Sequence, residues 1–185
     1  MGCFAVIDTE TNWENEVMSV GVVLADASDF ALLDSRYYIL TPEVTVGGMF
    51  EDQLEIVPRK RTVLCRREKA MEALESWLEQ AGVERIFAYN ACFDRRQLPE
   101  LGAYGWYDIM KVAAYRQHNP AIPAEAPCCT TGRLRSGYGV EPMLRLLLGD
   151  RSYRETHNAL FDAVDELQIM KLLRRPVNQY GCAKI

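Results

Sequence analysis

Four carboxylates and one histidine have the residue types and spacing of a metal-dependent site. Asp8 and Glu10 lie two residues apart, Asp94 follows much later, and Asp162 comes five residues after His157. Carboxylate oxygens are the ligands that Mg²⁺ and Mn²⁺ prefer in proteins. An imidazole titrates near neutral pH, so it can take a proton from a nearby water molecule. Asp8 and Glu10 together are therefore suited to hold a divalent cation, and His157 is of a residue type that can accept a proton.

The sequence around each acid predicts where it lies. Asp8 and Glu10 end an apolar run, and because side chains alternate along a strand, both carboxylates are expected on one face of a sheet. Asp94 follows another apolar run, at the strand end where open α/β sheets collect ligands. A single acid at a strand end or helix start is more often a solvated or capping residue. The prediction therefore depends on all the motifs occurring together.

Hydrophobic patterning predicts an α/β fold with a mixed sheet. Apolar runs at residues 3–7, 17–25 and 30–40 follow one another closely, as expected for antiparallel strands. Shorter strands at residues 85–89 and 106–108 are expected to be parallel, which makes five strands in all. Asn90 and Asp108 are suited to cap the helices that they precede. Helices are predicted at residues 70–81 before Gly82, 91–101, 108–116, 140–148 and 158–173.

The motifs and their order resemble the DEDDh exonucleases, a family that includes polymerase proofreading subunits, oligoribonuclease and RNase T. Asp8-Thr9-Glu10 resembles the first motif, residues 90–94 the second, and His157 with Asp162 the third. Because the motifs span most of the chain, the resemblance implies one exonuclease domain over residues 1–185. The implied fold is the three-layer RNase H-like fold, with the mixed five-stranded sheet flanked by helices.

Two near matches to the last motif are set aside. The related subclass with tyrosine in place of histidine is disfavoured, because the Tyr-x3-Asp run from Tyr104 to Asp108 precedes the last helix. Asp165 also lies near His157, but the family's spacing selects Asp162.

The resemblance implies a role for each site residue. Asp8, Glu10 and Asp162 would bind one divalent cation, with Asp8 shared by a second cation and Asp94 holding its hydration shell. The cations would be Mg²⁺ or Mn²⁺, and His157 would be the general base. The residues expected at the substrate are Thr11, Trp13, Asn90 and Phe93. For Trp13, stacking on the last base and burial in the core are both open; Phe93 is also suited to anchor its helix in the core.

The expected function is removal of nucleotides from the 3′ end of single-stranded nucleic acid, with DNA favoured, and release of nucleoside 5′-monophosphates. RNA trimming or digestion of short oligoribonucleotides is the alternative within this class, because no residue distinguishes the two sugars. A non-enzymatic alternative is an inactive nucleic-acid-binding or polymerase-associated module of the same fold. A homodimer or a polymerase subunit is possible, and no membrane partner is expected.

Composition limits these readings further. The net charge of −5 argues against general electrostatic binding of nucleic acid, so phosphate contacts are expected to be local. Candidates are Arg95, Arg96 and the basic stretch at residues 59–67, although charge runs are usually solvated faces.

The six cysteines lack metal-binding spacing and are expected to be reduced. With no apolar run long enough to span a bilayer, a cytoplasmic protein is expected. Residues 117–132 are expected to form a loop near the site.

Overall fold

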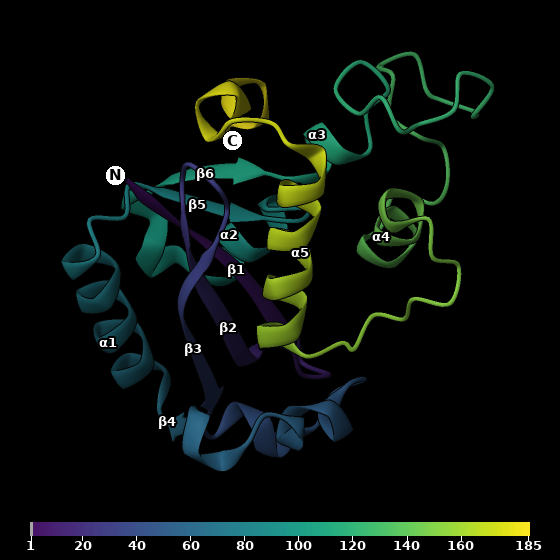
Figure 1. Cartoon of the computed structure of the whole chain (residues 1–185). Coiled ribbons are helices and arrows are strands. Elements are labelled where there is room, and N and C mark those ends of the chain that lie inside the picture. Colours follow the sequence, from purple (N-terminus) through teal and green to yellow (C-terminus); the bar gives the residue numbers. More distant parts are fainter. Residues whose placement is uncertain (1) are drawn as a thin grey trace.

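The computed structural model describes residues 2–185, which form a mixed sheet between two layers of helices (Figure 1). Six strands lie in the order β4-β3-β2-β1-β5-β6. Their bounds are β1 Cys3–Thr11, β2 Val17–Asp26, β3 Leu32–Leu40, β4 Thr62–Cys65, β5 Arg85–Ala88 and β6 Gly105–Asp108.

The strand directions agree with the sequence prediction, but the strand number does not. β1, β2 and β3 pair antiparallel, whereas β5 pairs parallel to β1 and to β6. The prediction of five strands was wrong because β4 adds a sixth, parallel to β3. This strand has four residues directly after the basic stretch at Arg59–Arg61. So short a segment carries too little periodicity to be recognised, and its pairing with the edge of β3 defines it as a strand.

Within residues 2–185, five α-helices and several 3₁₀ segments connect and follow the strands. The predicted helix at residues 91–101 divides at Pro99, which cannot donate a backbone hydrogen bond. The helix predicted at residues 108–116 is also shorter than expected. The α-helices are α1 Arg67–Gln80, α2 Cys92–Gln97, α3 Met110–Ala113, α4 Val140–Leu148 and α5 Ala159–Leu173, and the 3₁₀ segments are η1 Glu43–Val46, η2 Glu51–Ile56, η3 Arg59–Arg61, η4 Pro99–Ala103 and η5 Val177–Ala183.

The two predicted helix caps have different outcomes. The N-cap residue of α3 is Ile109 and not Asp108, but the Asp108 carboxylate accepts the backbone N–H groups of Met110, the first residue of α3, and of Asn90, each at 3.0 Å. Asn90 does not cap α2, because its side chain makes no cap hydrogen bond and its φ of 62° lies in the left-handed region. Asn90 instead forms the turn between β5 and α2, which its amide side chain tolerates.

The sheet separates two apolar cores. Phe4 and Val6 of β1 pack with α3, α4 and α5 on one face, whereas Ala5 and Ile7 pack with α1 on the other. This alternation is the two-residue period of a strand, and it continues to the end of β1. The next even-numbered residues, Asp8 and Glu10, therefore belong to the face that α5 covers.

Gly21 of β2 lets α5 approach the sheet closely. A Cβ atom at this position would lie 2.1 Å from the backbone carbonyl of Ala159 and 2.2 Å from the backbone nitrogen of Leu160. Neither backbone group can rotate away, so a side chain at Gly21 would push the start of α5 off the sheet. The position of this helix start, and of Asp162 in its first turn, therefore depends on a residue without a side chain.

We expect Gly21→Ala to lower the free energy of unfolding by more than about 3 kcal/mol, at the upper end of overpacking effects. Urea unfolding followed by circular dichroism measures this. Gly102→Ala is the matched control, because a Cβ there meets no atom within 4 Å. Equal unfolding midpoints for the two variants would show that α5 does not depend on Gly21.

Three further expectations concern the remainder of the described chain. All six cysteines are free, as predicted. Within residues 2–185, no helix combines the length and apolar character needed to cross a membrane. The predicted loop at residues 117–132 is irregular, with isolated bridges that join Tyr115 to Arg133 and Cys128 to Leu134 near its ends. It projects beyond α3 and α4 (Figure 1).

Candidate active site

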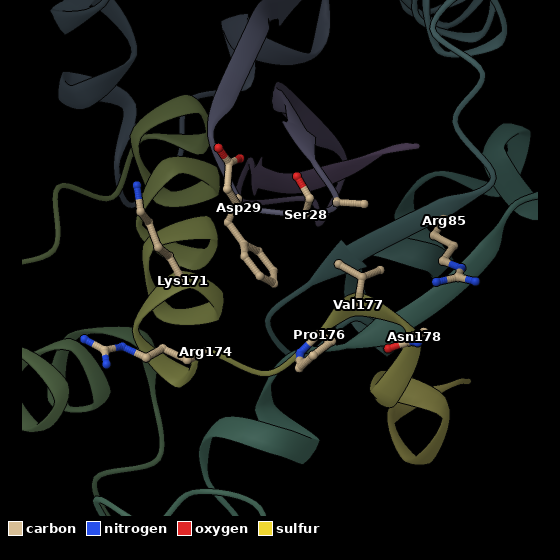
Figure 2. A pocket seen from close by; sticks show the side chains of 10 residues that line it. Ser28, Asp29, Arg85, Lys171, Arg174, Pro176, Val177 and Asn178 are labelled. Atoms are coloured by element: carbon tan, nitrogen blue, oxygen red, sulfur yellow. The ribbon is translucent and has the colours of Figure 1, made fainter. Parts of the chain in front are cut away.

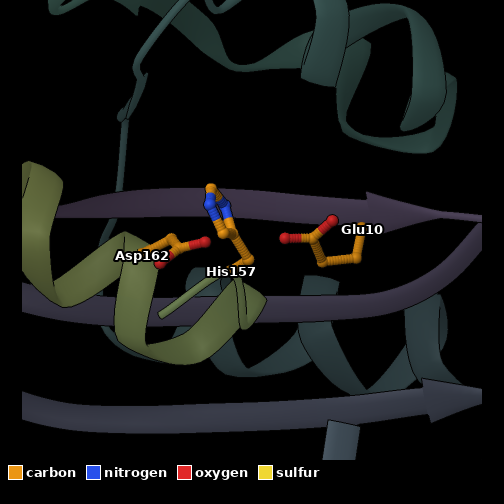
Figure 3. A group of neighbouring side chains, drawn as sticks. All are labelled: Glu10, His157 and Asp162. Carbon is orange, nitrogen blue, oxygen red and sulfur yellow. The ribbon is translucent and has the colours of Figure 1, made fainter. Parts of the chain in front are cut away.

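Glu10, His157 and Asp162 meet between the end of β1 and the start of α5 (Figure 3). One ligand atom from each of the three lies within 4.8 Å of the others, close enough for a single cation to contact all three. Figure 3 shows the two carboxylates pointing toward the space beside the imidazole ring. Glu10 is 147 or more positions away from His157 and Asp162 in the sequence. Only the packing of α5 on the sheet therefore brings the three residues together.

The chain around Asn158 fixes the start of α5. The buried Asn158 side chain accepts the backbone N–H groups of Leu160 and Phe161, which is an N-cap. Its amide also donates to the Tyr37 hydroxyl at 3.0 Å and to the Gln53 carbonyl at 2.8 Å. One side chain thus anchors α5 to β3 and to η2, and thereby positions the acid in its first turn.

His157 lies immediately before this cap in an unusual backbone conformation. Its φ of 57° lies in the left-handed region, which non-glycine residues seldom occupy. The imidazole stacks on the ring of Phe50, with ring centroids 4.1 Å apart and planes 14° from parallel. The histidine is therefore held from two sides, by the turn into α5 and by the segment that follows β3.

Asp94 and Asp8 complete the acidic cluster. Asp94 is in the first turn of α2 and is almost completely buried, and the Thr9 hydroxyl donates to its carboxylate at 2.8 Å. Asp8 is close enough to Asp94 for their mutual repulsion to raise the pKa of Asp8. All four predicted acids thus belong to one cluster, which lies at the C-terminal end of β1 and at the starts of α2 and α5.

Burial and mutual repulsion dominate the electrostatics of this cluster. Burial, followed by repulsion from Glu155, raises the pKa of Glu10 to about 7. The same two causes raise the pKa of Asp162 to about 8, and burial raises the pKa of Asp94 to about 7. The pKa of Asp8 lies well above its usual range, with burial as the largest cause. Among residues 2–185, no lysine or arginine forms an ion pair with these acids.

Sequence reasoning missed two acids of this site. Glu166 is buried in α5, and repulsion from Asp94 and Asp162 adds to burial in raising its pKa. Glu155 precedes His157, whose charge lowers the Glu155 pKa against the larger effect of burial. The available signal for Glu166 was its spacing: it follows Asp162 by one helical turn on the face that packs against the sheet.

The site residues fit a divalent cation of the magnesium type. Asp162 Oδ1 and Glu166 Oε2 are buried and make no hydrogen bond, although a buried charge normally requires a partner or a metal ion. The donors are carboxylate oxygens with one imidazole and no thiolate, which suits Mg²⁺ or Mn²⁺ better than a soft metal. The acids that would hold the cations are Asp8, Glu10, Asp94 and Asp162.

Without a cation, these acids should make stability depend on pH. The pKa values of Glu10, Asp94 and Asp162 are raised to about 7, 7 and 8, whereas carboxyl groups in an unfolded chain titrate near pH 4. Between these limits the folded chain binds more protons than the unfolded chain, so the free energy of unfolding falls as pH rises. Stability from these groups is thus present below about pH 4 and lost through about pH 8.

We therefore expect the unfolding midpoint of the metal-free chain to fall by about 5 °C or more from pH 5 to pH 8, at about 2–4 °C per kcal/mol. Millimolar Mg²⁺ should restore stability more at the higher pH, because cations bind the ionised carboxylates. Differential scanning calorimetry with EDTA or Mg²⁺ measures both effects. A midpoint that rises with pH in EDTA would contradict the assigned clustering of the acids.

The residues expected at the substrate differ in their exposure. Thr11 ends β1 and is half-buried, as is Phe93 in the first turn of α2. Phe93 is therefore not the core anchor that the sequence suggested. Asn90 is exposed in the turn before α2. Trp13 is 66% exposed, which excludes the alternative of an ordinary buried aromatic residue.

The basic residues that were candidates for phosphate binding differ in whether their side chains are already bonded. Arg67 is engaged by the Glu100 carboxylate at 2.8 Å and by the Gln97 carbonyl, so it is not free to bind a phosphate. Arg61 donates to the Ser35 hydroxyl at 2.8 Å, near the edge of the sheet. Arg95 and Arg96 are exposed on α2, directly after Asp94. These two arginines are the basic residues nearest in sequence to the acidic cluster.

A separate pocket lies at the other end of α5 (Figure 2). It is lined by the turn between β2 and β3, by Arg85 at the start of β5, and by Lys171 and Arg174. Lys171 is nine residues beyond Asp162, which is about 13 Å along an α-helix. In Figure 2 the Arg85 and Arg174 guanidinium groups point away from each other. None of the site acids lines this pocket, so it is distinct from the acidic cluster.

Comparisons with known proteins give fold relatives but no sequence relatives. No protein-family model matches the sequence, and no curated protein sequence matches it significantly. Among solved structures, the nuclease domain of 3′hExo, a DEDDh family member solved with bound rAMP, is 18% identical with a TM-score of 0.64. That match covers 99% of this chain and 94% of the other.

Two further structures show the same similarity. A 3′-exonuclease solved for its 3′-end-specific recognition of a histone mRNA stem-loop is 17% identical, with a TM-score of 0.63 over 98% of this chain and 84% of the other. Exonuclease I from E. coli, in complex with a 5cy-dT13 oligonucleotide, is 13% identical, with a TM-score of 0.63 over 97% of this chain and 42% of the other. The chain therefore has the RNase H-like fold of the DEDDh 3′-exonucleases.

Proposed function

We propose that this chain is a single-domain 3′–5′ exonuclease that hydrolyses the terminal phosphodiester bond of a single-stranded nucleic acid, DNA in the first place. The products are a nucleoside 5′-monophosphate and a strand shorter by one nucleotide. The observation that carries the proposal is the meeting of Glu10, His157 and Asp162, with ligand atoms within 4.8 Å of one another, inside a buried acidic cluster.

In this proposal the four acids together hold two divalent cations. Glu10 and Asp162 form one group with His157, and Asp8 is close enough to Asp94, Asp162 and Glu10 for their charges to raise its pKa. Asp8 would be the acid that both cations share. When bound, two such cations would offset the charge that develops on the attacking and leaving oxygens. The raised pKa values of the acids are the consequence of gathering carboxylates without a cation.

His157 is suited to take the proton of the attacking water. Its ring lies beside the Glu10 and Asp162 carboxylates, and the stack on Phe50 orients it. As the water oxygen bonds to phosphorus, its proton passes to the imidazole and the bond to the 3′ oxygen of the preceding nucleotide breaks. The exposure of Trp13 supports a role in stacking on a terminal base, a contact worth about 1–3 kcal/mol.

RNA is the second candidate substrate, and the structures of two fold relatives support it. One of them was solved with bound rAMP and another with a histone mRNA stem-loop, whereas Exonuclease I was solved with a DNA oligonucleotide. The inactive-module alternative has less support, because a relic would have no reason to keep all four acids, with Asp94 and Asp162 buried, beside a histidine.

Digestion of labelled strands tests the proposal. A 5′-labelled single-stranded DNA should shorten one nucleotide at a time in Mg²⁺ or Mn²⁺, and a 3′-labelled strand should release labelled mononucleotide at once. EDTA should stop both reactions. An RNA of the same sequence and a dinucleotide, digested in parallel, identify the preferred sugar and length. Internal cuts, or equal digestion in EDTA, would refute the proposed reaction.

A further inference from the structure

Glu166 is a buried carboxylate that the four-acid site does not account for. Only 1% of the residue is exposed, and its Oε2 atom makes no hydrogen bond. None of the ion pairs formed by residues 2–185 includes it. A glutamate is almost never fully buried unless it is paired or bound to a metal ion, because removing its charge from water is costly. Something other than the protein's own side chains is therefore expected to contact Oε2.

The position of Glu166 on α5 directs it into the acidic cluster. It follows Asp162 by four residues, so the two side chains lie on the same face of the helix, which packs against β1 and β2. Like charges at this spacing repel each other, and an isolated helix gains nothing from them. Asp162 also has a buried oxygen without a partner, Oδ1. Two adjacent turns of α5 thus each present an unpartnered carboxylate oxygen to the end of β1.

Glu166 belongs to the same acidic cluster as the predicted acids. It lies close enough to Asp8, Asp94 and Asp162 for repulsion between the charges to raise pKa values in the group, in addition to the effect of burial. The buried Oε2 atom without a partner is therefore an oxygen of the cluster that holds the predicted acids.

We infer that Glu166 is a fifth carboxylate ligand of the cation site. The inference rests on the proposed function, because it assigns Glu166 to one of the two proposed cations. Its oxygen would replace a water ligand there, which explains why Oε2 has no protein partner. That cation should consequently bind more weakly when the carboxylate is removed.

Isothermal titration calorimetry of the full chain with MnCl₂ tests this inference without relying on activity. The wild-type chain is expected to bind two Mn²⁺ ions. Glu166→Gln should keep one ion and bind the other about tenfold or more weakly, which is at least the effect of removing a supporting partner of a metal ligand. Glu166→Asp, which keeps the charge but shortens the side chain, should give a smaller loss and guards against misfolding of the first variant.

Asp165→Asn is the matched control. Asp165 is the neighbouring acid on α5, but its carboxylate accepts the Tyr153 hydroxyl, so both Mn²⁺ affinities should stay unchanged. Unchanged binding of both ions by Glu166→Gln would overturn the inference and leave the proposed function standing. A wild-type chain that binds no Mn²⁺ would refute the proposed function and the inference together.

Discussion

Replacing His157 with alanine is expected to lower kcat by about 10²–10⁴-fold, the usual contribution of a general base. The fold should persist, because the N-cap of α5 comes from Asn158 and the left-handed backbone at His157 becomes only slightly less favourable. Cation binding should also persist, because the carboxylates remain. Single-turnover release of mononucleotide from a 3′-labelled strand measures the loss.

The chain provides a matched control for this variant. Its other histidine, His118, lies beside the Arg175 guanidinium at 3.2 Å and makes no contact with the acidic cluster among the described hydrogen bonds. His118→Ala should therefore turn over at the wild-type rate. Partial rescue of His157→Ala by added imidazole would further identify proton transfer as the missing step. Near-normal release by His157→Ala would exclude the histidine as the base.

Asp162→Ala is expected to reduce digestion by about 10³-fold or more, because offsetting charge at the reacting phosphate with a metal ion is worth several kcal/mol. Mn²⁺ affinity should fall with it. The metal-free variant should nevertheless be no less stable than the wild type near pH 8, because it lacks a buried acid whose pKa is raised to about 8. Loss of activity without loss of stability separates this ligand role from a structural one.

Asp165→Ala is the control for this second variant. Asp165 lies one turn along the same helix, but it is bonded by the Tyr153 hydroxyl and is not in the group formed by Glu10, His157 and Asp162. Its removal should leave the rate within a few-fold of the wild type. A comparable loss of digestion in both variants would show that α5 tolerates no change here, and the ligand role of Asp162 would lose its support.

Local pattern predicted the parts of the site that depend on one element. The alternation along β1 placed Asp8 and Glu10 on one face, and the apolar stripe after Asn158 placed Asp162 in the first turn of a helix. Both depend on a fixed period, which a sequence displays directly. The directions of the first strands followed from their close spacing in the same way.

The features that sequence reasoning missed depend on contacts between distant elements. The Phe50 ring lies against His157 although 107 residues separate them, and no local pattern marks that pair. Glu166 was not singled out in the sequence, and it is the packing of α5 against the sheet that buries it. For Trp13 the sequence left stacking on a base and burial in the core open, and the exposed surface position excludes burial. Tertiary packing determines each of these features, and the periodicity of the sequence does not reveal it.

The most direct test of the account is to locate the cations themselves. Crystals of the chain grown with MnCl₂ should show two anomalous difference peaks about 4 Å apart, both within the cluster of Asp8, Glu10, Asp94 and Asp162. Coordination at one of them by Glu166 would support the further inference as well. Anomalous density only outside this cluster, with the acids in the positions described, would contradict the claim that they gather to hold a pair of divalent cations.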